Sequence, residues 1–505
     1  METELKLRVP PEAVKRIASH PLFKSGARAP VQKLRAVYYD TPNLDLWRKG
    51  AALRVRREGT RWIQTVNWSG ETKAGVHERN ELEIEVPGPA PDCGKFLHAD
   101  IEHLFSPPEL TGSLKPVFET NVRRSTRMLD LGDVVIEANF DRGEITSGER
   151  REPVSELELE LKRGAAPALF RTGLHIVETA PVALENRSKA ERGYALYRDT
   201  FQTPLKAFVP ALDASMSVSD AFAAIGWSAL KHLQGNEQGV LEGADPEFLH
   251  QMRVAVRRLR SALSAFSEVL PAAERIPMGV DLKWLGGVLG PARDWDVFVT
   301  ETLPVIRGQF EEWPALARLA EQSARLQARA HRRAHRAMGS RRYQRVLIGL
   351  ASSLAVQRWR EHPESDAAAL LAPARVYAQG ELERRYEQVR KRGRNLGTLS
   401  AEGLHQLRIA IKKLRYSVDF FASLFNADAI KRFRSRLSRL QDVLGTLNDA
   451  AMLRHLVESA CKVESEPALA EARGIVLGWR AGRSGALKDE LDRFWKGFRR
   501  SETYW

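Results

Sequence analysis

The chain has 505 residues, of which 43% are hydrophobic and 28% are charged, a composition typical of soluble globular proteins. A single hydrophobic core stops growing at roughly 250–300 residues, so this length predicts two domains. The chain contains no run of about 18 apolar residues, and its acidic start is unlike a signal peptide, which together predict a cytoplasmic protein with no membrane partner. Cys93 and Cys461 fall in different predicted domains and are expected to be reduced thiols.

The net charge of +14 is distributed unevenly along the chain. Residues 201–505 contain 47 Lys and Arg against 34 Asp and Glu, whereas residues 1–200 contain 31 against 30. This asymmetry predicts an anionic partner for the C-terminal part: nucleic acid, polyphosphate or an acidic lipid surface. A basic surface that serves only solubility is the alternative.

Short runs of alternating apolar and polar residues dominate residues 1–200 and predict β-strands. The run 155–162 places Glu156, Glu158, Glu160 and Lys162 on one face and leucines on the other. Such a row of ionisable groups is expected to bind something, unless it is a charged outer face. The predicted strands are residues 2–9, 51–57, 62–67, 81–86, 134–140 and 155–162.

The polar faces of these strands combine carboxylates with cations. Residues that share a face are, strand by strand, Glu2, Glu4 and Lys6; Arg54 and Arg56; Glu81 and Glu83; and Glu156, Glu158 and Glu160. Mg²⁺ and Mn²⁺ prefer carboxylate oxygens, while a triphosphate needs several cations around its oxygens. A cavity containing both sets would suit a metal–triphosphate complex, whose hydrolysis is a phosphoryl transfer that needs no covalent nucleophile.

Residues 1–200 resemble the CYTH superfamily, also called triphosphate tunnel metalloenzymes. The resemblance rests on the E-x-E-x-K motif at Glu2, Glu4 and Lys6, followed by Tyr38-Tyr39-Asp40-Thr41, Leu53-Arg54-Val55-Arg56, Phe118-Glu119-Thr120, Phe140-Asp141-Arg142-Gly143, Glu156-Leu157-Glu158-Leu159-Glu160 and Ser188-Lys189-Ala190-Glu191-Arg192-Gly193-Tyr194. It implies an α+β domain with an antiparallel β-barrel, whose tunnel hydrolyses a triphosphate with Mg²⁺ or Mn²⁺.

The resemblance also implies roles for individual residues. Metal binding and water activation would fall to Glu2, Glu4, Glu158 and Glu160, with Glu156 and Asp141 nearby. Phosphate binding would fall to Lys6, Arg54, Arg56, Arg124 and Lys189, and the implied catalytic set is Glu2, Glu4, Lys6 and Glu158. Arg123 and Arg124 project to opposite faces of a strand, so only one enters the tunnel, and Arg124 is the one expected.

Asn67 departs from the family pattern, which usually has a phosphate-binding Lys at this position. Asn keeps a hydrogen-bond donor but loses the charge, which weakens substrate binding by an amount on the order of 1–3 kcal/mol in a desolvated site. Lys73 is a candidate substitute from a nearby loop. We therefore expect an enzyme of low activity or different substrate, or a barrel that binds phosphate chains without turnover.

A linker at residues 201–214 precedes a helical region at 215–500 that contains an internal repeat. Residues 250–260 recur as residues 405–415, at an offset of 155 residues, and the similarity continues for about 45 residues. The repeat predicts an all-α domain of two helical bundles related by a pseudo-two-fold axis.

Each copy of the repeat places basic side chains at positions i, i+3, i+7 and i+10, which form one stripe of a helix. The stripes consist of His250, Arg253, Arg257 and Arg260, and of His405, Arg408, Lys412 and Arg415, with Arg258 and Lys413 beside them. Like charges at this spacing destabilise a bare helix, so we expect either an anionic ligand or internal pairing with Asp294 and Asp449. Basic clusters that would extend the surface are Arg332, Arg333 and Arg336; Arg341, Arg342 and Arg345; and Lys431, Arg432, Arg434, Arg436 and Arg439.

Base-stacking aromatic residues are not interleaved with these stripes, which favours an all-phosphate ligand over specific binding of nucleic acid. The repeated motif resembles the CHAD domain (conserved histidine α-helical domain) over roughly residues 215–500. This resemblance implies two four-helix bundles that bind inorganic polyphosphate and, in bacteria, target proteins to polyphosphate granules.

The combination of both domains resembles bacterial inorganic triphosphatases. A polyphosphate-granule protein with a non-catalytic barrel is the alternative hypothesis, and adenylate cyclase activity, which also occurs in CYTH proteins, is a third. The substrate stays open among inorganic triphosphate, nucleoside triphosphates, thiamine triphosphate and longer chains.

Overall fold

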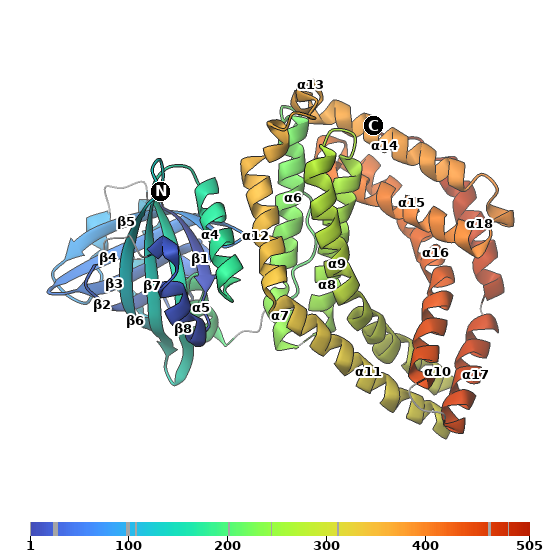
Figure 1. Cartoon of the computed structure of the whole chain (residues 1–505), viewed down its shortest axis with the longest axis horizontal. Helices are drawn as coiled ribbons and strands as arrows, with labels where there is room; N and C mark the ends of the chain where they lie inside the picture. Colours follow the sequence, from blue (N-terminus) through green and yellow to red (C-terminus); the bar gives the residue numbers. More distant parts are fainter. Residues whose placement is uncertain are drawn as a thin grey trace. The chain divides into compact units, whose positions relative to one another are not determined.

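The computed structural model describes residues 2–23, 29–96, 101–106, 109–199, 203–243, 245–310, 313–462, 466–482 and 484–505. Residues 201 and 202 of the predicted linker lie outside this part, as does residue 200 at the end of the predicted first domain. The chain divides into two compact units (Figure 1), which are residues 1–203 with 339–356 and residues 204–338 with 357–505. None of the described helices is long and apolar enough to cross a bilayer.

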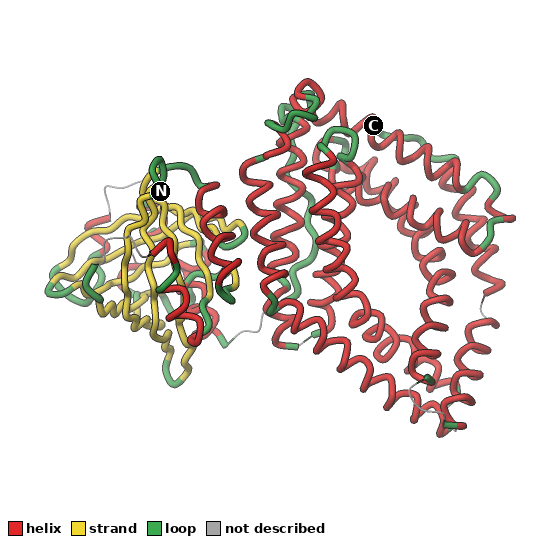
Figure 2. Tube along the Cα trace, in the orientation of Figure 1, coloured by secondary structure: helices red, strands yellow, loops and turns green. Residues whose placement is uncertain are grey.

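The first unit is built around an antiparallel β-barrel, drawn in yellow in Figure 2. Its strands pair in the order β5-β4-β3-β2-β6-β7-β8-β1, and β1 also pairs with β5, which closes the ring. The strands are β1 (Glu2–Arg8), β2 (Gln32–Asp40), β3 (Ala51–Glu58), β4 (Arg61–Lys73), β5 (Val76–Val86), β6 (Lys115–Asp130), β7 (Val135–Ser147) and β8 (Arg150–Arg163), with the short β9 (Ala183–Leu184) beside β1. Small helices of this unit are α1 (Val14–Ala18), α2 (Asp45–Arg48) and α3 (Glu109–Gly112).

The alternation of β1 and β8 separates an apolar outer face from a charged inner face. Leu5 and Leu159 are fully buried and face each other across the β1–β8 ladder. They lie beneath α4 (Pro167–Thr179), in which Gly173 permits close approach: a Cβ at this position would lie 2.6 Å from Leu5 Cδ2. The acidic and basic residues between the leucines therefore point into the barrel.

Helix α5 (Lys189–Arg198) packs against β6, β7 and β8 at one end of the barrel. A capping box begins it: Ser188 Oγ accepts from the Glu191 backbone N–H at 3.1 Å, and the Glu191 carboxylate accepts from the Ser188 N–H at 2.7 Å. Gly193 lets the helix approach Phe118, since a Cβ there would lie 2.1 Å from the ring. These contacts place Lys189, in the first turn, at the inner face.

The second unit is entirely helical among its described residues. Its helices are α6 (Val218–Gln234), α7 (Glu237–Glu242), α8 (Pro246–Ala265), α9 (Ala272–Val297), α10 (Leu303–Gln309), α11 (Pro314–Met338), α13 (Ala367–Leu371), α14 (Ala374–Arg392), α15 (Ala401–Phe420), α16 (Ala427–Cys461), α17 (Pro467–Gly482) and α18 (Ser484–Arg499). The repeat copies form the packed pairs α8–α9 and α15–α16, and α8 contacts α15. An antiparallel barrel followed by an all-helical domain confirms the predicted fold class.

Helix α12 (Arg341–Val356) lies within the predicted helical domain but belongs to the first unit. It packs on α4, and the Gln344 side chain accepts a hydrogen bond from the Leu184 backbone N–H at 3.0 Å. The first unit is therefore discontinuous in sequence, which differs from the predicted division at residues 201–214.

Candidate active site

A cavity of about 530 Å³ runs inside the barrel. Most of the charged or polar positions singled out for the tunnel line it: Glu2, Glu4, Lys6, Arg54, Arg56, Asn67, Glu81, Glu83, Arg124, Asp141, Glu158, Glu160 and Lys189. Glu156, which was expected near the metal, is not among the lining residues. Arg124 points into the cavity as expected, whereas Arg123 lines a separate surface depression. The structure thus brings together residues that are up to 187 positions apart in the chain.

The floor of the cavity is a buried network of charges on β1, β7, β8 and α5. Lys6 is 4% exposed, contacts Glu158 and lies 2.8 Å from the Glu4 carboxylate. Burial alone would lower the pKa of Lys6, but the negative charges of Glu158 and Glu4 outweigh it and raise this pKa. The ammonium group of Lys6 therefore stays charged where it faces the cavity.

Three buried carboxylates cluster on the inner face of β7 and β8. Oxygen atoms of Asp141, Glu156 and Glu158 all lie within 4.8 Å of one another. Lys189 contacts all three, at 2.7 Å from Asp141 and 2.9 Å from Glu158, and Arg124 lies 2.6 Å from Asp141 and 2.5 Å from Glu158. Burial would raise the pKa of Glu158, but the charges of Lys189, Lys6 and Arg124 hold it well below its usual value.

The opposite wall, on β3 and β5, pairs arginines with glutamates. Arg54 lies 3.2 Å from Glu81, and Arg56 lies 3.3 Å from Glu83. Burial, together with a hydrogen bond to Glu2, raises the pKa of Glu81 to about 8, although Arg54 opposes this shift. Buried Nε–H groups of both arginines have no hydrogen-bond partner among the described residues. These two buried donors are therefore not satisfied within the described part of the protein itself.

Arg79 is a tunnel residue that the sequence interpretation missed. It lies on β5 opposite Glu2 in the ladder, lines the cavity and donates to the Glu4 carboxylate at 3.1 Å. The predicted strand began at residue 81, whereas β5 begins at Val76. The signal was present, because Arg79 shares the alternating face of Glu81 and Glu83.

Asn67 lines the cavity without replacing the expected charge. Its Oδ1 is buried and has no hydrogen-bond partner in the described part of the chain. Lys73, the candidate substitute, is not among the residues that line the cavity, and its ammonium lies 2.8 Å from Glu71. The expectation that Lys73 substitutes for the family's Lys is therefore wrong in this structure, because Lys73 lies near the end of β4 with a partner of its own.

The lining of the cavity suits a divalent cation. Eight carboxylate and seven cationic side chains are among the described residues that line it, so the wall has little positive charge to spare for a polyanionic triphosphate. Burial, with the negative charges of Glu2 and Glu137 adding to it and Lys162 opposing it, raises the pKa of Glu160. Oxygen donors of this kind are those that Mg²⁺ and Mn²⁺ prefer. The tightest carboxylate cluster includes Asp141 and Glu156, however, and so differs from the predicted metal set of Glu2, Glu4, Glu158 and Glu160.

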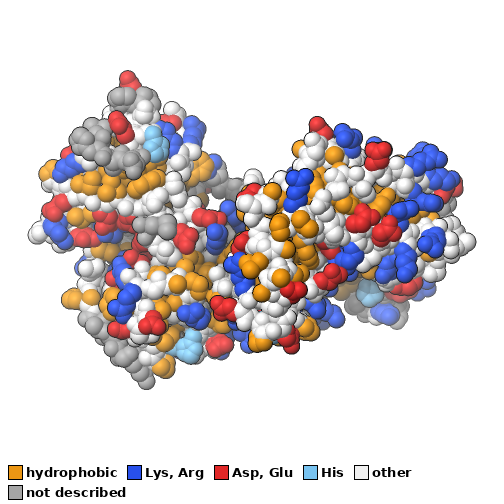
Figure 3. Space-filling model, turned by 90° about the horizontal axis from the view of Figure 1, so that it is seen from above, with side chains coloured by type: hydrophobic (Ala, Val, Ile, Leu, Met, Phe, Trp, Pro, Cys, Tyr) orange, Lys and Arg blue, Asp and Glu red, His pale blue; other side chains and the backbone are white. Residues whose placement is uncertain are grey.

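The predicted basic stripes of the helical unit lie on neighbouring helices. Helices α8 and α15 contact each other, and Arg257 Nε donates to the Tyr416 hydroxyl at 3.2 Å. Arg260 is exposed, and Arg253 lies 3.1 Å from Asp294, so the predicted internal pairing occurs in the first copy. The side chain of Asp449 lies outside the described residues. Figure 3 shows many Lys and Arg side chains, interspersed with Asp and Glu, on the visible face of this unit.

Two parts of the predicted basic surface require correction. Arg258 is only 3% exposed, donates to the Phe208 carbonyl at 2.9 Å and lies over the Phe420 ring, so it holds helices together instead of facing a ligand. Arg341, Arg342 and Arg345 lie on α12 and belong to the first unit. The clusters on α11 and α16 remain in the helical unit, with Arg332, Arg333, Arg336, Lys431, Arg432, Arg436 and Arg439 exposed and Arg434 half-buried.

Comparison with known proteins finds a matching domain family for each unit. A family model for the CYTH domain matches residues 1–194, and one for the CHAD domain matches residues 224–458. An inorganic triphosphatase of Haemophilus influenzae is 33% identical over 176 residues, which cover 33% of this chain and 46% of that protein. The match therefore spans less than half of that relative. An uncharacterised protein of Mycobacterium tuberculosis is 25% identical over 497 residues, which cover 92% of this chain and 90% of that protein.

The helical unit also has a solved structural relative. The crystal structure of the CHAD domain from the plant Ricinus communis is 32% identical, with a TM-score of 0.53, and the match covers 60% of this chain and 99% of that domain. The chain therefore belongs to the proteins that join an N-terminal CYTH domain to a CHAD domain.

Proposed function

We propose that the barrel hydrolyses a triphosphate with Mg²⁺ or Mn²⁺. The observation that supports this most directly is the cavity of about 530 Å³ that carboxylates and cations line together. The relative from Haemophilus influenzae, an inorganic triphosphatase, supports the same reaction class. Lys6, Arg54, Arg56, Arg124 and Lys189 bind the phosphate oxygens in this proposal, and Arg79 joins them.

The reaction joins a water oxygen to the terminal phosphorus and breaks the bridging P–O bond, which releases phosphate and diphosphate. The cations of the wall neutralise charge that develops on the leaving oxygen. Burial opposes ionisation of Glu2, but Glu81, Lys6 and Arg79 lower the pKa of Glu2, so its carboxylate is available to accept the proton of water. A metal ion bound by Glu2, Glu4, Glu158 and Glu160 would polarise the phosphoryl oxygens.

Phosphate release from inorganic triphosphate tests this proposal. We expect turnover by the full chain that requires Mg²⁺ or Mn²⁺ and falls at least about a hundredfold in Glu4→Gln, because the substitution removes a buried charge from the cavity. Glu144→Gln is the matched control, since Glu144 lies on β7 outside the cavity and pairs with Arg151 at 3.0 Å. Equal activity of both variants would contradict the assignment.

For the helical unit we propose binding of inorganic polyphosphate and association with polyphosphate granules. The adjacent stripes on α8 and α15 support this, with His250, Arg253, Arg257, Arg260, His405, Arg408, Lys412, Lys413 and Arg415 as the proposed contacts. Guanidinium and ammonium groups match a chain of phosphates, each of which adds a salt-sensitive contribution to binding.

A polyphosphate-binding protein with a non-catalytic barrel is the second candidate. Asn67 favours it, because the charge that the family usually has there is missing from β4 and Lys73 does not supply it. Absence of metal-dependent turnover, together with retained polyphosphate binding, would select this candidate over the enzyme.

A further inference from the structure

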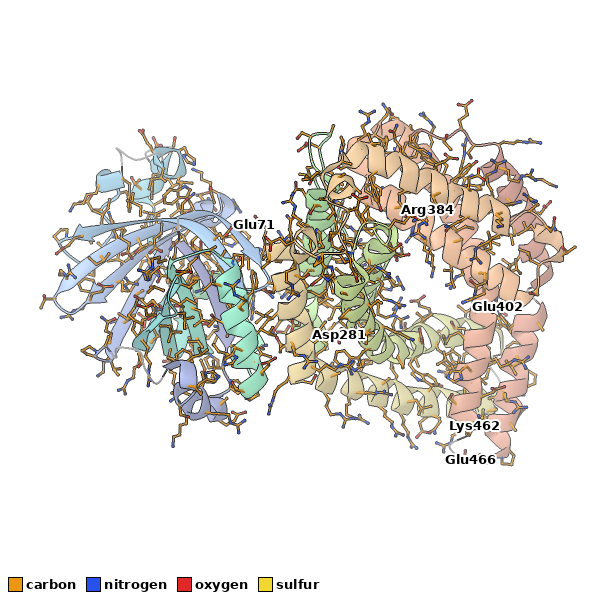
Figure 4. The ribbon with its side chains drawn as sticks, turned by 45° about the horizontal axis from the view of Figure 1, so that its top comes forward. Glu71, Asp281, Arg384, Glu402, Lys462 and Glu466 are labelled. Atoms are coloured by element: carbon orange, nitrogen blue, oxygen red, sulfur yellow. The ribbon has the colours of Figure 1, made fainter. Side chains whose placement is uncertain are left out.

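A depression lined by arginines lies on the outside of the barrel, separate from the tunnel. Its volume is about 710 Å³, and none of the described residues that line it also lines the tunnel. Side chains project from both faces of the barrel strands (Figure 4), so Arg123 faces outward while its neighbour Arg124 faces the tunnel. The lining comes from β6, β7 and β8, from the segment Pro11–Ala18, and from Val31 just before β2.

Two arginines of this depression lie side by side without a counter-ion. Arg123 on β6 and Arg142 on β7 are direct partners in the antiparallel ladder. Both are exposed, and neither side chain forms an ion pair or a hydrogen bond within the described part of the chain. The next pair of the same ladder, Arg124 and Asp141, has opposite charges and is bonded at 2.6 Å. Because like charges directly opposite each other destabilise a strand pair, a bound anion would offset the repulsion between Arg123 and Arg142.

Further hydrogen-bond donors lie on the same face of β6. Ser125 and Arg127 follow Arg123 at alternate positions and also line the depression. Arg127 Nη1 donates to the Phe23 carbonyl at 2.5 Å, which holds this guanidinium in place. No Asp or Glu is among the described residues of the lining, whereas the tunnel wall combines carboxylates with cations. The depression therefore offers positive charge and donors for an anion, and no ligands for a metal ion.

The rest of the lining is mostly apolar. It includes Val14, Ala18, Val31, Phe140 and Pro153, and the Val31 side chain is 50% exposed. The volume of about 710 Å³ falls within the roughly 300–1,000 Å³ typical of sites that enclose a small molecule. An inorganic phosphate chain has no apolar part that could cover this wall. The ligand that fits best therefore joins an anionic group to an apolar body.

A phosphate monoester matches the two neighbouring arginines in charge and in geometry. Such a group carries about −1.5 to −2 charges at pH 7 and three acceptor oxygens, whereas a carboxylate carries one charge and two oxygens. Guanidinium forks bind phosphate oxygens in pairs, so one phosphate can engage both arginines.

We propose that this depression binds a small phosphate monoester with an apolar substituent. The phosphate lies between Arg123 and Arg142, and the substituent packs against Val14 and Val31. The site is independent of the hydrolysis proposed for the tunnel, with which it shares no described lining residue.

Isothermal titration calorimetry of the full chain with hexyl phosphate tests the proposal. We expect Arg142→Gln to weaken binding at least about tenfold, because one charge-assisted fork is lost. Arg151→Gln is the matched control and should bind as the wild type does, since Arg151 is exposed on the neighbouring strand β8 and lines neither cavity. The triphosphatase activity of Arg142→Gln should stay at the wild-type level, because Arg142 lies outside the tunnel.

Two further probes separate the phosphate from the apolar part. Inorganic phosphate should bind at least about tenfold more weakly than hexyl phosphate, and hexanol should show no binding, because each lacks one half of the ligand. Val31→Ser should weaken hexyl phosphate binding about threefold and leave inorganic phosphate binding unchanged, since this exposed side chain contributes only apolar contact.

Equal affinity of the wild type and Arg142→Gln for hexyl phosphate would overturn the proposal. A loss of binding in Arg56→Gln instead would assign the ligand to the tunnel, with the same consequence. Equal affinity for inorganic phosphate and hexyl phosphate would show that the apolar wall takes no part. Binding to vesicles that contain phosphatidic acid, without binding of hexyl phosphate, would replace the small molecule by a lipid surface.

Discussion

Arg79 brings into the tunnel a positive charge that β4 lacks. Asn67 pairs with Glu81 in the β4–β5 ladder, and Arg79 lies two residues before Glu81 on the same face. Diagonal neighbours of this kind lie about 7–8 Å apart, within reach of a long side chain. Arg79 is thus placed to compensate for the charge missing at Asn67, while its bond to Glu4 holds it at the cavity wall.

We expect Arg79→Gln to raise KM for triphosphate about tenfold, since a charge-assisted contact contributes roughly 1.5–3 kcal/mol before solvent compensates part of it. The double variant Asn67→Lys with Arg79→Gln should recover most of the loss for inorganic triphosphate. Arg61→Gln is the control, because Arg61 is exposed on β4 and lies 4.0 Å from Glu85. If the double variant had the same KM as Arg79→Gln alone, the charge of Arg79 would not compensate for the charge missing at Asn67.

At the scale of elements, α12 completes the barrel unit. It packs on α4, which covers the leucines of β1, and Gln344 bonds to β9 at the edge of β1. A Cβ at Gly173 would lie 3.9 Å from Ile348 Cδ1, so this α12 side chain faces α4 directly. The strand that carries Glu4 and Lys6 is therefore supported by a helix encoded about 340 residues later.

We expect Ile348→Ala to lower the free energy of unfolding of the first unit by about 2–4 kcal/mol, because Ile348 is fully buried and its truncation leaves a cavity. Thermal unfolding, followed together with triphosphatase activity, measures this loss. Arg345→Ala on the same helix is the control, since Arg345 is exposed. If Ile348→Ala unfolded and lost its triphosphatase activity at the same temperature as the wild-type chain, α12 would not support the barrel.

At the scale of the whole molecule, the two units differ in how their charged side chains are distributed. The near-neutral first 200 residues bury paired charges in a tunnel, whereas the helical unit exposes most of the excess Lys and Arg on helix surfaces. Buried pairs would discriminate one small polyanion by geometry, whereas the basic stripes, half-buried except for the exposed Arg260, would bind long polyanions mainly through charge.

We expect polyphosphate binding to weaken steeply as the salt concentration rises. Arg260→Gln should make the slope of log K against log salt concentration shallower by about one unit, the contribution of one phosphate contact. Arg260 suits this test because it is exposed on α8. Arg493→Gln, also exposed but on α18, should leave binding nearly unchanged. Equal competition by DNA at matched salt would indicate general polyanion binding instead.

Local periodicity was sufficient to predict which side chains share a face. Alternation placed Glu2, Glu4 and Lys6 together, and it separated Arg124 from Arg123, because successive side chains of a strand point to opposite faces. The repeat, at an offset of 155 residues, likewise predicted two copies of a basic helix. The strands β2 and β6 were not predicted as alternating runs. Strands β4, β5, β7 and β8 proved longer than predicted, because partner strands extend the pairing beyond their alternating segments.

The sequence by itself therefore determined the two domain families, the fold class and most of the tunnel wall, since these follow from short-range period and motif. Only the tertiary structure decided that β1 closes on β5 beside Arg79, that Arg258 turns inward, that α12 joins the barrel unit and that arginines of β6 and β7 meet at a depression outside the barrel. These features depend on register and packing between segments far apart in the chain, which the pattern of any one segment does not contain.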